Sequence, residues 1–414
     1  MRKLRALAAI GIGAAVLGLA CNAIVGIDAA TLGTDADAGP PSVDGSQLQD
    51  AESAEAAADG ASDVVVAQDA ADAGSGCNSA FPPPRPTVED GTLDLEIDTA
   101  LRSLDLGVVL DGGTPPIYGY DLDHVCTCFG TPPGPESCKA RVVGATHCDE
   151  PNGRDNSAGE LLRTFTEVTN GAFDPTSINT RVNQGAYGLV LRLRHYNGGM
   201  NDQAVELAVF VSNGTPLVGD SATPPAPAWD GKDSWTLDSD SVVGMQPQPD
   251  GGMLDVPSFV DVNAYVAGGV LVASVDFPLT LGGGNSGVLT LQLTGSAITA
   301  NVVAQGSSYR LDNGVLAGRW ATAKLLASLG ATSNPLPPGG FICPGTAFYN
   351  TVKSYICKGA DIFVDPTATD PTQPCDAISI GMGFTAYPAV LGPVTSKGAH
   401  ALNCDAGIPP DDCN

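Results

Sequence analysis

Residues 187–211 read YGLVLRLRHYNGGMNDQAVELAVFV, with a glycine-rich centre between two apolar runs. Alternate side chains of a strand point to opposite faces. The three leucines at 189, 191 and 193 therefore share one face with Tyr187 and His195, whereas Arg192 and Arg194 point to the other. The centre, YNGGMNDQA, is typical of a hairpin connection. The stretch predicts an antiparallel hairpin with one buried face.

Further β-type runs lie on both sides of this hairpin. LDLEID at 93–98 alternates, and GVLVASVDF, GVLTLQL and ITANVVA follow at 269–277, 287–293 and 298–304. The chain holds 51 Gly and 32 Pro but only 6% aromatic residues, which suits short strands joined by turns. Short, regularly spaced strands without long helices between them predict a mainly β fold. We expect an antiparallel β-sandwich of jelly-roll or lectin-like architecture over residues 77–330.

The pattern changes towards the C-terminus. Residues 320–330 and 346–363 have helical spacing, and five cysteines lie in or after this region. We expect residues 331–414 to form a small, disulfide-rich helical extension. A short helix is also predicted from near Ser157, in AGELLRTF.

The N-terminus has the layout of an export signal. Arg2, Lys3 and Arg5 precede the uncharged run AIGIGAAVLGLA, which ends at Cys21. Residues 1–20 resemble bacterial lipoprotein signal peptides, which implies that Cys21 is lipidated and becomes the new N-terminus. One position departs from that pattern, because Gly18 stands where a large aliphatic residue is usual. The alternative is an ordinary secretory signal that is cleaved nearby.

Residues 21–76 are predicted to be a disordered acidic tether. From Asn22 to Gly76 there are nine Asp and two Glu but no Lys, Arg or aromatic residue, so little apolar surface can be buried. The start, CNAIVGID, resembles uncharacterised surface lipoproteins of myxobacterial type. That resemblance implies a place in the cell envelope, at the outer membrane or the extracellular surface, and no particular activity. Position 22, directly after the cysteine, is Asn and not the Asp that retains many lipoproteins at the inner membrane. An acidic tail that binds a basic partner is the alternative.

The net charge excludes some partners. The formal charge is −27, and cleavage of the three basic residues in the signal would make it −30. A polyanion of this size repels nucleic acid and attracts divalent cations. We therefore expect no nucleic-acid partner, and a membrane contact only through the lipid anchor.

Ten cysteines follow Cys21, and in an exported chain disulfides are the default. They form two groups of five. The first group is Cys77, Cys126, Cys128, Cys138 and Cys148, and the second is Cys343, Cys357, Cys375, Cys404 and Cys413. Because each group has an odd number, at least one bridge joins the two groups if all ten are paired. A zinc site is the alternative for the first group with His147. The C-x-C spacing and the oxidising compartment speak against it.

Acidic and amide oxygens concentrate in residues 119–160. The candidate metal ligands are Asp121, Asp123, Asp149, Asn152, Asp155 and Asn156. Such hard oxygens are the ligands that Ca²⁺ prefers, and the neighbouring glycines permit tight turns. The spacing is not that of an EF-hand. The alternative is a set of solvated turns whose carboxylates cap local amides.

No catalytic motif is present: the sequence has no nucleophile elbow, phosphate loop or dinucleotide fingerprint, and we assign no catalytic residue or organic cofactor. We expect a lipid-anchored binding or structural module of the envelope, calcium-stabilised, with a glycan or an envelope protein as partner. Trp229, Trp235 and Trp320 are able to stack on sugars, although core packing is the commoner role. The alternative function is a glycosidase-like hydrolase with two carboxylates in one cleft.

Overall fold

The computed structural model describes residues 78–107, 116–129, 135–142, 146–168, 175–219, 223–247, 253–282, 288–332, 334, 340–396, 404 and 411–413. They belong to one compact unit within Asp72–Asn414. The predicted signal peptide, Cys21, the tether and Cys77 lie outside the described residues.

The described chain is mainly β, as predicted. Its strands are β1 (Leu95–Asp105), β2 (Cys138–Lys139), β3 (Gly188–Tyr196), β4 (Asp202–Gly214), β5 (Ser234–Asp238), β6 (Val242–Pro247), β7 (Met253–Pro257), β8 (Phe259–Ala267), β9 (Val270–Ala273), β10 (Pro278–Gly282), β11 (Val288–Gln305), β12 (Ser308–Ala321), β13 (Asp370–Pro374), β14 (Ala377–Pro388) and β15 (Val390–Thr395). Its α-helices are α1 (Ala158–Val168), α2 (Pro175–Asn183), α3 (Thr322–Ser328) and α4 (Ala347–Lys358).

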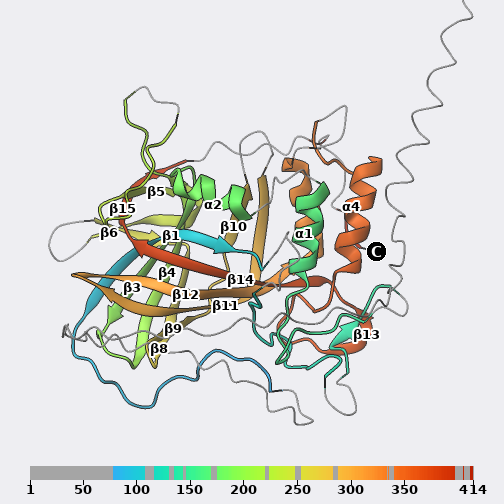
Figure 1. Ribbon diagram of the computed structural model, residues 1–414, viewed down its shortest axis with the longest axis horizontal. Helices are drawn as coiled ribbons and strands as arrows, with labels where there is room; N and C mark the ends of the chain where they lie inside the picture. The colour runs from blue at the N-terminus through green and yellow to red at the C-terminus, as the bar shows by residue number, and fades with distance from the viewer. Residues whose placement is uncertain are drawn as a thin grey trace, which may run out of the picture. The chain divides into compact units, whose positions relative to one another are not determined.

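Eight strands close into a barrel rather than forming the two sheets of a sandwich (Figure 1). Their order is β4-β3-β1-β14-β12-β11-β9-β8, and β8 returns to pair with β4. The expected sandwich is corrected by this last pairing, because a closed sheet has no free edge at that seam. Strands β5 and β15 extend the sheet beyond β4, and β10 pairs with β11.

The barrel interior is filled by side chains. On β3, Leu189, Leu191 and Leu193 are buried in the main core, where Leu207 and Val209 of β4 join them. The cavity left among the apolar side chains measures only 20 Å³. An eight-stranded barrel is just wide enough for its side chains.

The hairpin β3–β4 is confirmed, with one difference at its tip. Arg192 lies outside the barrel, where its guanidinium pairs with Asp98 at 2.8 Å. His195, however, has a φ of +62° and bonds to Asp94, while Tyr196 is buried instead. The pairing with β1 shifts register here, so a bulge reverses the predicted orientation.

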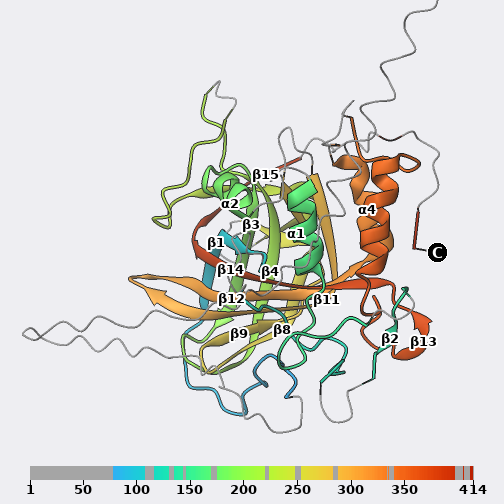
Figure 2. The same ribbon diagram turned by 45° about the vertical axis from the view of Figure 1, so that its right-hand side comes forward.

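The predicted helical extension, 331–414, also supplies strands to the sheet. It contains α4, but β14 lies between β1 and β12 in the barrel. Residues 331–414 are therefore part of the same folded unit as residues 77–330. Figure 2 shows α1 and α4 side by side, with β2 and β13 near one end of α4. The described part of residues 119–160, where the acidic and amide oxygens concentrate, runs through this region.

Candidate functional site

One long connection joins β1 to α1 and includes β2. We call its described residues, 116–129, 135–142 and 146–157, the acidic loops. Disulfides hold them in place. Cys128 pairs with Cys148 inside the loops, and Cys138 pairs with Cys375 just before β14. Backbone hydrogen bonds also hold the loops together: the Asp155 N–H donates to the Tyr120 carbonyl at 3.0 Å.

The disulfide prediction is confirmed for nine cysteines, while the tenth, Cys77, lies outside the described residues. Cys138–Cys375 is the expected bridge between the two groups. Two further bridges join Cys343 to Cys404 and Cys357 to Cys413. Because Cys126, Cys128, Cys138 and Cys148 are all oxidised, the zinc alternative has no thiolate ligands.

The acidic loops bring three of the predicted ligands together. Asp121, Asp123 and Asp155 each offer a carboxylate oxygen, and these oxygens lie within 4.8 Å of one another. Only 2% of Asp121 and 2% of Asp155 is exposed. We call this group the three-aspartate site.

Backbone amides satisfy two of these carboxylates and not the third. Oδ2 of Asp155 accepts hydrogen bonds from the Leu122 N–H at 2.6 Å and the Asp123 N–H at 3.3 Å. Oδ1 of Asp123 accepts one from the Val125 N–H at 2.9 Å. Both oxygens of Asp121 are buried without a hydrogen-bond partner among the described residues. A buried carboxylate without a partner is costly unless a cation binds it.

The raised pKa values of the neighbouring aspartates also favour a bound cation. Burial, followed by the charge of Asp123, raises the pKa of Asp155 well above its usual range. Burial also raises the pKa of Asp123, that of Asp149 to about 8, and that of Asp361 to about 6. Each of these carboxylates lies close enough to other aspartates for their charges to repel.

One buried arginine balances part of this charge. Arg319 of β12 is 3% exposed, and its guanidinium donates to the carbonyls of Leu122 and Gly295. Burial lowers its pKa, whereas the charges of Asp155 and Asp123 oppose that shift. The carboxylates outnumber this single guanidinium, so ionising all of them together is unfavourable unless another cation is present.

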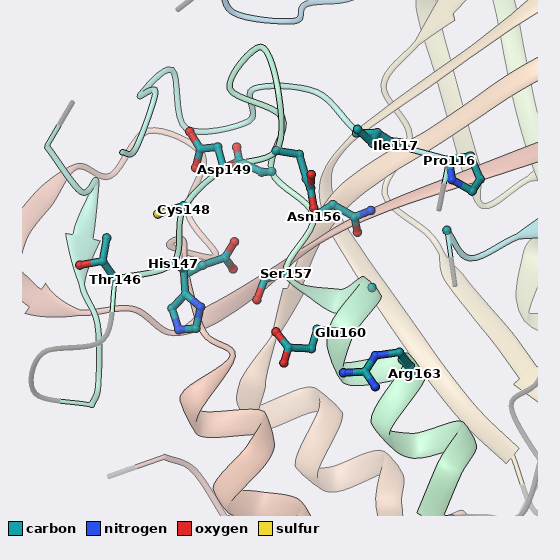
Figure 3. Close-up of a pocket in the computed structure, with 15 residues that line it drawn as sticks. Pro116, Ile117, Thr146, His147, Cys148, Asp149, Asn156, Ser157, Glu160 and Arg163 are labelled. Carbon is teal, nitrogen blue, oxygen red and sulfur yellow. The ribbon is translucent and has the colours of Figure 1, made fainter. Parts of the chain in front are cut away.

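A cavity of 540 Å³ adjoins the three-aspartate site and shares Asp155 with it (Figure 3). Asp149 and Asp361 line it, as do Glu150 and Glu160. Figure 3 shows Arg163 of α1 beside Glu160. His147, considered above as a zinc ligand, instead places Nε2 2.5 Å from the Lys358 carbonyl. The cavity is therefore polar and rich in carboxylates.

The other predicted ligands have different places. Asp149 lines the cavity, and its Oδ2 accepts from the Thr127 N–H at 2.6 Å. Asn152 lies in an exposed turn with a φ of +66°, and its backbone carbonyl binds the Ala80 N–H. Oδ1 of Asn156 accepts from the Gly381 N–H at 2.9 Å. Asn152 and Asn156 therefore support the loops, the first through its backbone carbonyl and the second through a bond to a distant strand.

Sequence reasoning missed two members of this region. Asp361 follows α4 and accepts hydrogen bonds from the backbone and hydroxyl of Ser379, whereas Arg319 comes from β12. No local motif marks either residue. Only the barrel topology brings these distant segments beside the acidic loops.

The tryptophans provide no open sugar platform. Trp235 and Trp320 are fully buried, and Trp229 lies half-buried with Arg102 over its ring. Core packing is therefore their role in the fold.

Comparison with protein families, curated proteins and solved structures finds no match to this chain. Among the described residues, no helix combines the length and apolarity needed to cross a membrane.

Proposed function

We propose that the folded unit is a calcium-binding module, with the ion held by Asp121, Asp123 and Asp155. The observation that carries this proposal is Asp121, whose buried carboxylate has no hydrogen-bond partner in the described chain. A divalent cation together with the Arg319 guanidinium balances the three ionised carboxylates. Binding thus removes the cost of an uncompensated buried charge.

Calcium fits this donor set better than zinc or magnesium. The ligands are hard oxygens on irregular loops, which suits the variable six- to eight-fold coordination of Ca²⁺. Mg²⁺ requires a stricter octahedron, and zinc favours sulfur and nitrogen ligands. Water or a bound ligand supplies the remaining oxygens.

In this proposal the module works in the cell envelope. Residues 1–20 direct export, Cys21 carries a lipid anchor at the outer membrane, and the acidic tether holds the barrel away from the lipid. The disulfides support export, because such bridges persist in oxidising compartments. We propose a binding role rather than the glycosidase alternative, because ion coordination occupies the most buried carboxylates of the region.

The test is thermal unfolding of the oxidised full-length protein with excess Ca²⁺ and with chelator. An ion present at one hundred times its Kd adds about 2.7 kcal/mol to the free energy of unfolding. We expect Asp121→Asn to abolish this gain. With chelator, the same variant should be at least as stable as wild type, because it removes an unpaired buried charge.

Asp240→Asn is the matched control, since it makes the same chemical change at an exposed side chain outside the site. It should keep the full calcium response. If the wild type unfolds at the same temperature with Ca²⁺ and with chelator, or if Asp121→Asn keeps the response, the proposal is wrong.

A further inference from the structure

We propose that Arg319 is the positioning residue of the three-aspartate site: its guanidinium holds the peptide between Leu122 and Asp123 in the orientation that ion binding requires. This inference rests on the proposed function, because it concerns the calcium affinity of the same site. It adds a residue of barrel strand β12 that fixes the ligands without being a ligand itself.

The peptide group between Leu122 and Asp123 is held at both of its polar ends. Its N–H, which belongs to Asp123, donates to Oδ2 of Asp155 at 3.3 Å. Its carbonyl, which belongs to Leu122, accepts from the Arg319 guanidinium. Because a peptide group is planar, a partner at each end fixes its orientation. Asp121 and Asp123 flank Leu122, so this peptide also helps to set where their two carboxylates lie.

An apolar contact supports the same turn from the same strand. Leu122 packs with Ala317 of β12 in a small buried cluster. Ala317 and Arg319 are two residues apart, so their side chains leave the same face of the strand. Leu316 and Trp320, on the other face, lie in the main core. The outer face of β12 thus binds the turn through both an alkyl side chain and a guanidinium.

A bulge in β11 supplies the second anchor of the guanidinium. The pairing of β11 with β12 shifts register between Thr294 and Ala297, and Gly295 has a φ of +53° there. The Gly295 carbonyl accepts from Nη1 of Arg319 at 3.3 Å. The planar guanidinium therefore joins a carbonyl of the acidic loops to a carbonyl of the barrel.

These contacts are those of a clamp rather than of a counter-ion. The hydrogen bonds of Arg319 go to two carbonyls, and it forms no salt bridge with a carboxylate in the described chain. The two roles predict opposite results, because a positive charge beside a cation site repels the ion. Removing a mere counter-charge should tighten calcium binding, whereas removing a clamp should weaken it.

The experiment is calcium titration calorimetry on the oxidised full-length protein, with the free energy of unfolding measured separately in chelator. Lysine keeps the charge but lacks the planar fork, so Arg319→Lys should bind Ca²⁺ about tenfold more weakly than the wild type. Arg319→Gln loses the clamp and the repulsion together, so its affinity should lie between these two. Arg192→Gln is the matched control, because it removes a buried guanidinium that pairs with Asp98. It should lose stability and keep its calcium affinity.

Gly295→Ala tests the same contact without changing the arginine or any charge, and it decides the question if the buried substitutions do not fold. A Cβ at this position would lie 2.6 Å from Nη1 of Arg319, so the guanidinium must shift. We expect about threefold lower calcium affinity, because the clamp is displaced but not removed. Gly306→Ala is the matched control. Gly306 has a similar φ of +62°, but its Cβ would meet no atom within 4 Å, so calcium affinity should not change.

Several results overturn this inference and leave the calcium proposal intact. They are wild-type affinity in Arg319→Lys, affinity in Arg319→Gln equal to or above that of the wild type, and wild-type affinity in Gly295→Ala. An equal loss of affinity in the Arg192→Gln or Gly306→Ala control also overturns it, because the effect is then general destabilisation. If the wild-type protein binds no Ca²⁺, the proposed function is wrong and this inference fails with it.

Discussion

At the scale of single residues, the site depends on how backbone amides are shared among the aspartates. Asp155 accepts two N–H groups and Asp123 accepts one, so both side chains are fixed in place. Asp121 accepts none from the described residues. Asp121 is thus the carboxylate that gains most from a cation, and its neighbours are already oriented to share it.

The raised pKa values predict how the stability of the calcium-free protein changes with pH. Asp149, at about 8, and Asp361, at about 6, hold protons in the folded state that the unfolded chain releases near its ordinary pKa of 3.8. The contribution of these two groups to the free energy of unfolding should therefore be full below about pH 3.8 and should be lost as the pH rises to about 8. Chemical denaturation in chelator across this range measures it.

Calcium should reduce this loss, because Asp149 and Asp361 feel the charge of the proposed ligands, and a bound cation offsets that repulsion and favours their ionised forms. The control is the same series with saturating Ca²⁺. A calcium-free protein whose stability rises steadily from pH 5 to pH 8 would contradict the prediction.

At the scale of elements, the sequence reveals strands more readily than their partners. The alternation of residues 187–211 predicts β3 and β4 correctly, since alternation is a local property of a half-buried strand. The bulge at His195 leaves no comparable signal, because it depends on the register between β3 and β1. The predicted runs at 287–293 and 298–304 are parts of one long strand, β11.

The sequence pattern does not predict β14, for a related reason. Its sequence, AISIGMGFTAYP, is largely buried on both faces and so lacks the alternation of a half-exposed strand. Its glycines have a packing role, because a Cβ on Gly383 would collide with the Tyr118 ring. The strand therefore accommodates the start of the acidic loops on its surface.

The candidate site was predictable to the extent that it is local. Asp121 and Asp123 share one short run, and Asp155 lies in a second run that a disulfide brings close, so composition places them among the six candidates without separating them from the other three. Arg319 belongs to barrel strand β12 and Asp361 to the segment after α4, and both are distant in sequence from the acidic loops. Their place depends on strand order, which no local pattern specifies.

The Cys138–Cys375 bridge should matter for both stability and ion binding. It joins the acidic loops to the chain just before β14, and its sequence separation is 237 residues. Replacing both cysteines with serine should lower the free energy of unfolding by about 2–5 kcal/mol. It should also weaken calcium binding, because the loops are less constrained. Denaturant unfolding and calcium titration measure the two effects.

The matched control replaces Cys357 and Cys413, a bridge from α4 to the C-terminal segment. That double variant should lose stability but keep its calcium affinity. Equal calcium affinity in the Cys138/Cys375 variant and the wild type would show that the bridge does not organise the site.

At the scale of the whole folded unit, the pairing of β4 with both β3 and β8 makes the barrel one cooperative structure. Opening any of its strands exposes the shared core. The β6–β7 hairpin is different, because it forms a separate two-stranded sheet. Local stability should therefore differ sharply between the barrel and this hairpin.

Hydrogen exchange should show this difference directly. We expect the amides of β1, β12 and β14 to exchange last and together, near the global free energy of unfolding, and those of β6 and β7 to exchange first. Mass spectrometry of peptides from the full-length protein measures both. Exchange of β14 as fast as that of the hairpin would show that the barrel is not a single cooperative unit.

The position of β14 also constrains the order in which the protein can be made. This strand fills the gap between β1 and β12, yet it follows both of them in the chain. Until β14 is made, the growing chain exposes the edges of β1 and β12, which are templates for aggregation. The barrel can therefore close only once the chain as far as Pro388 is available, and a chain that ends before β14 should leave both edges open.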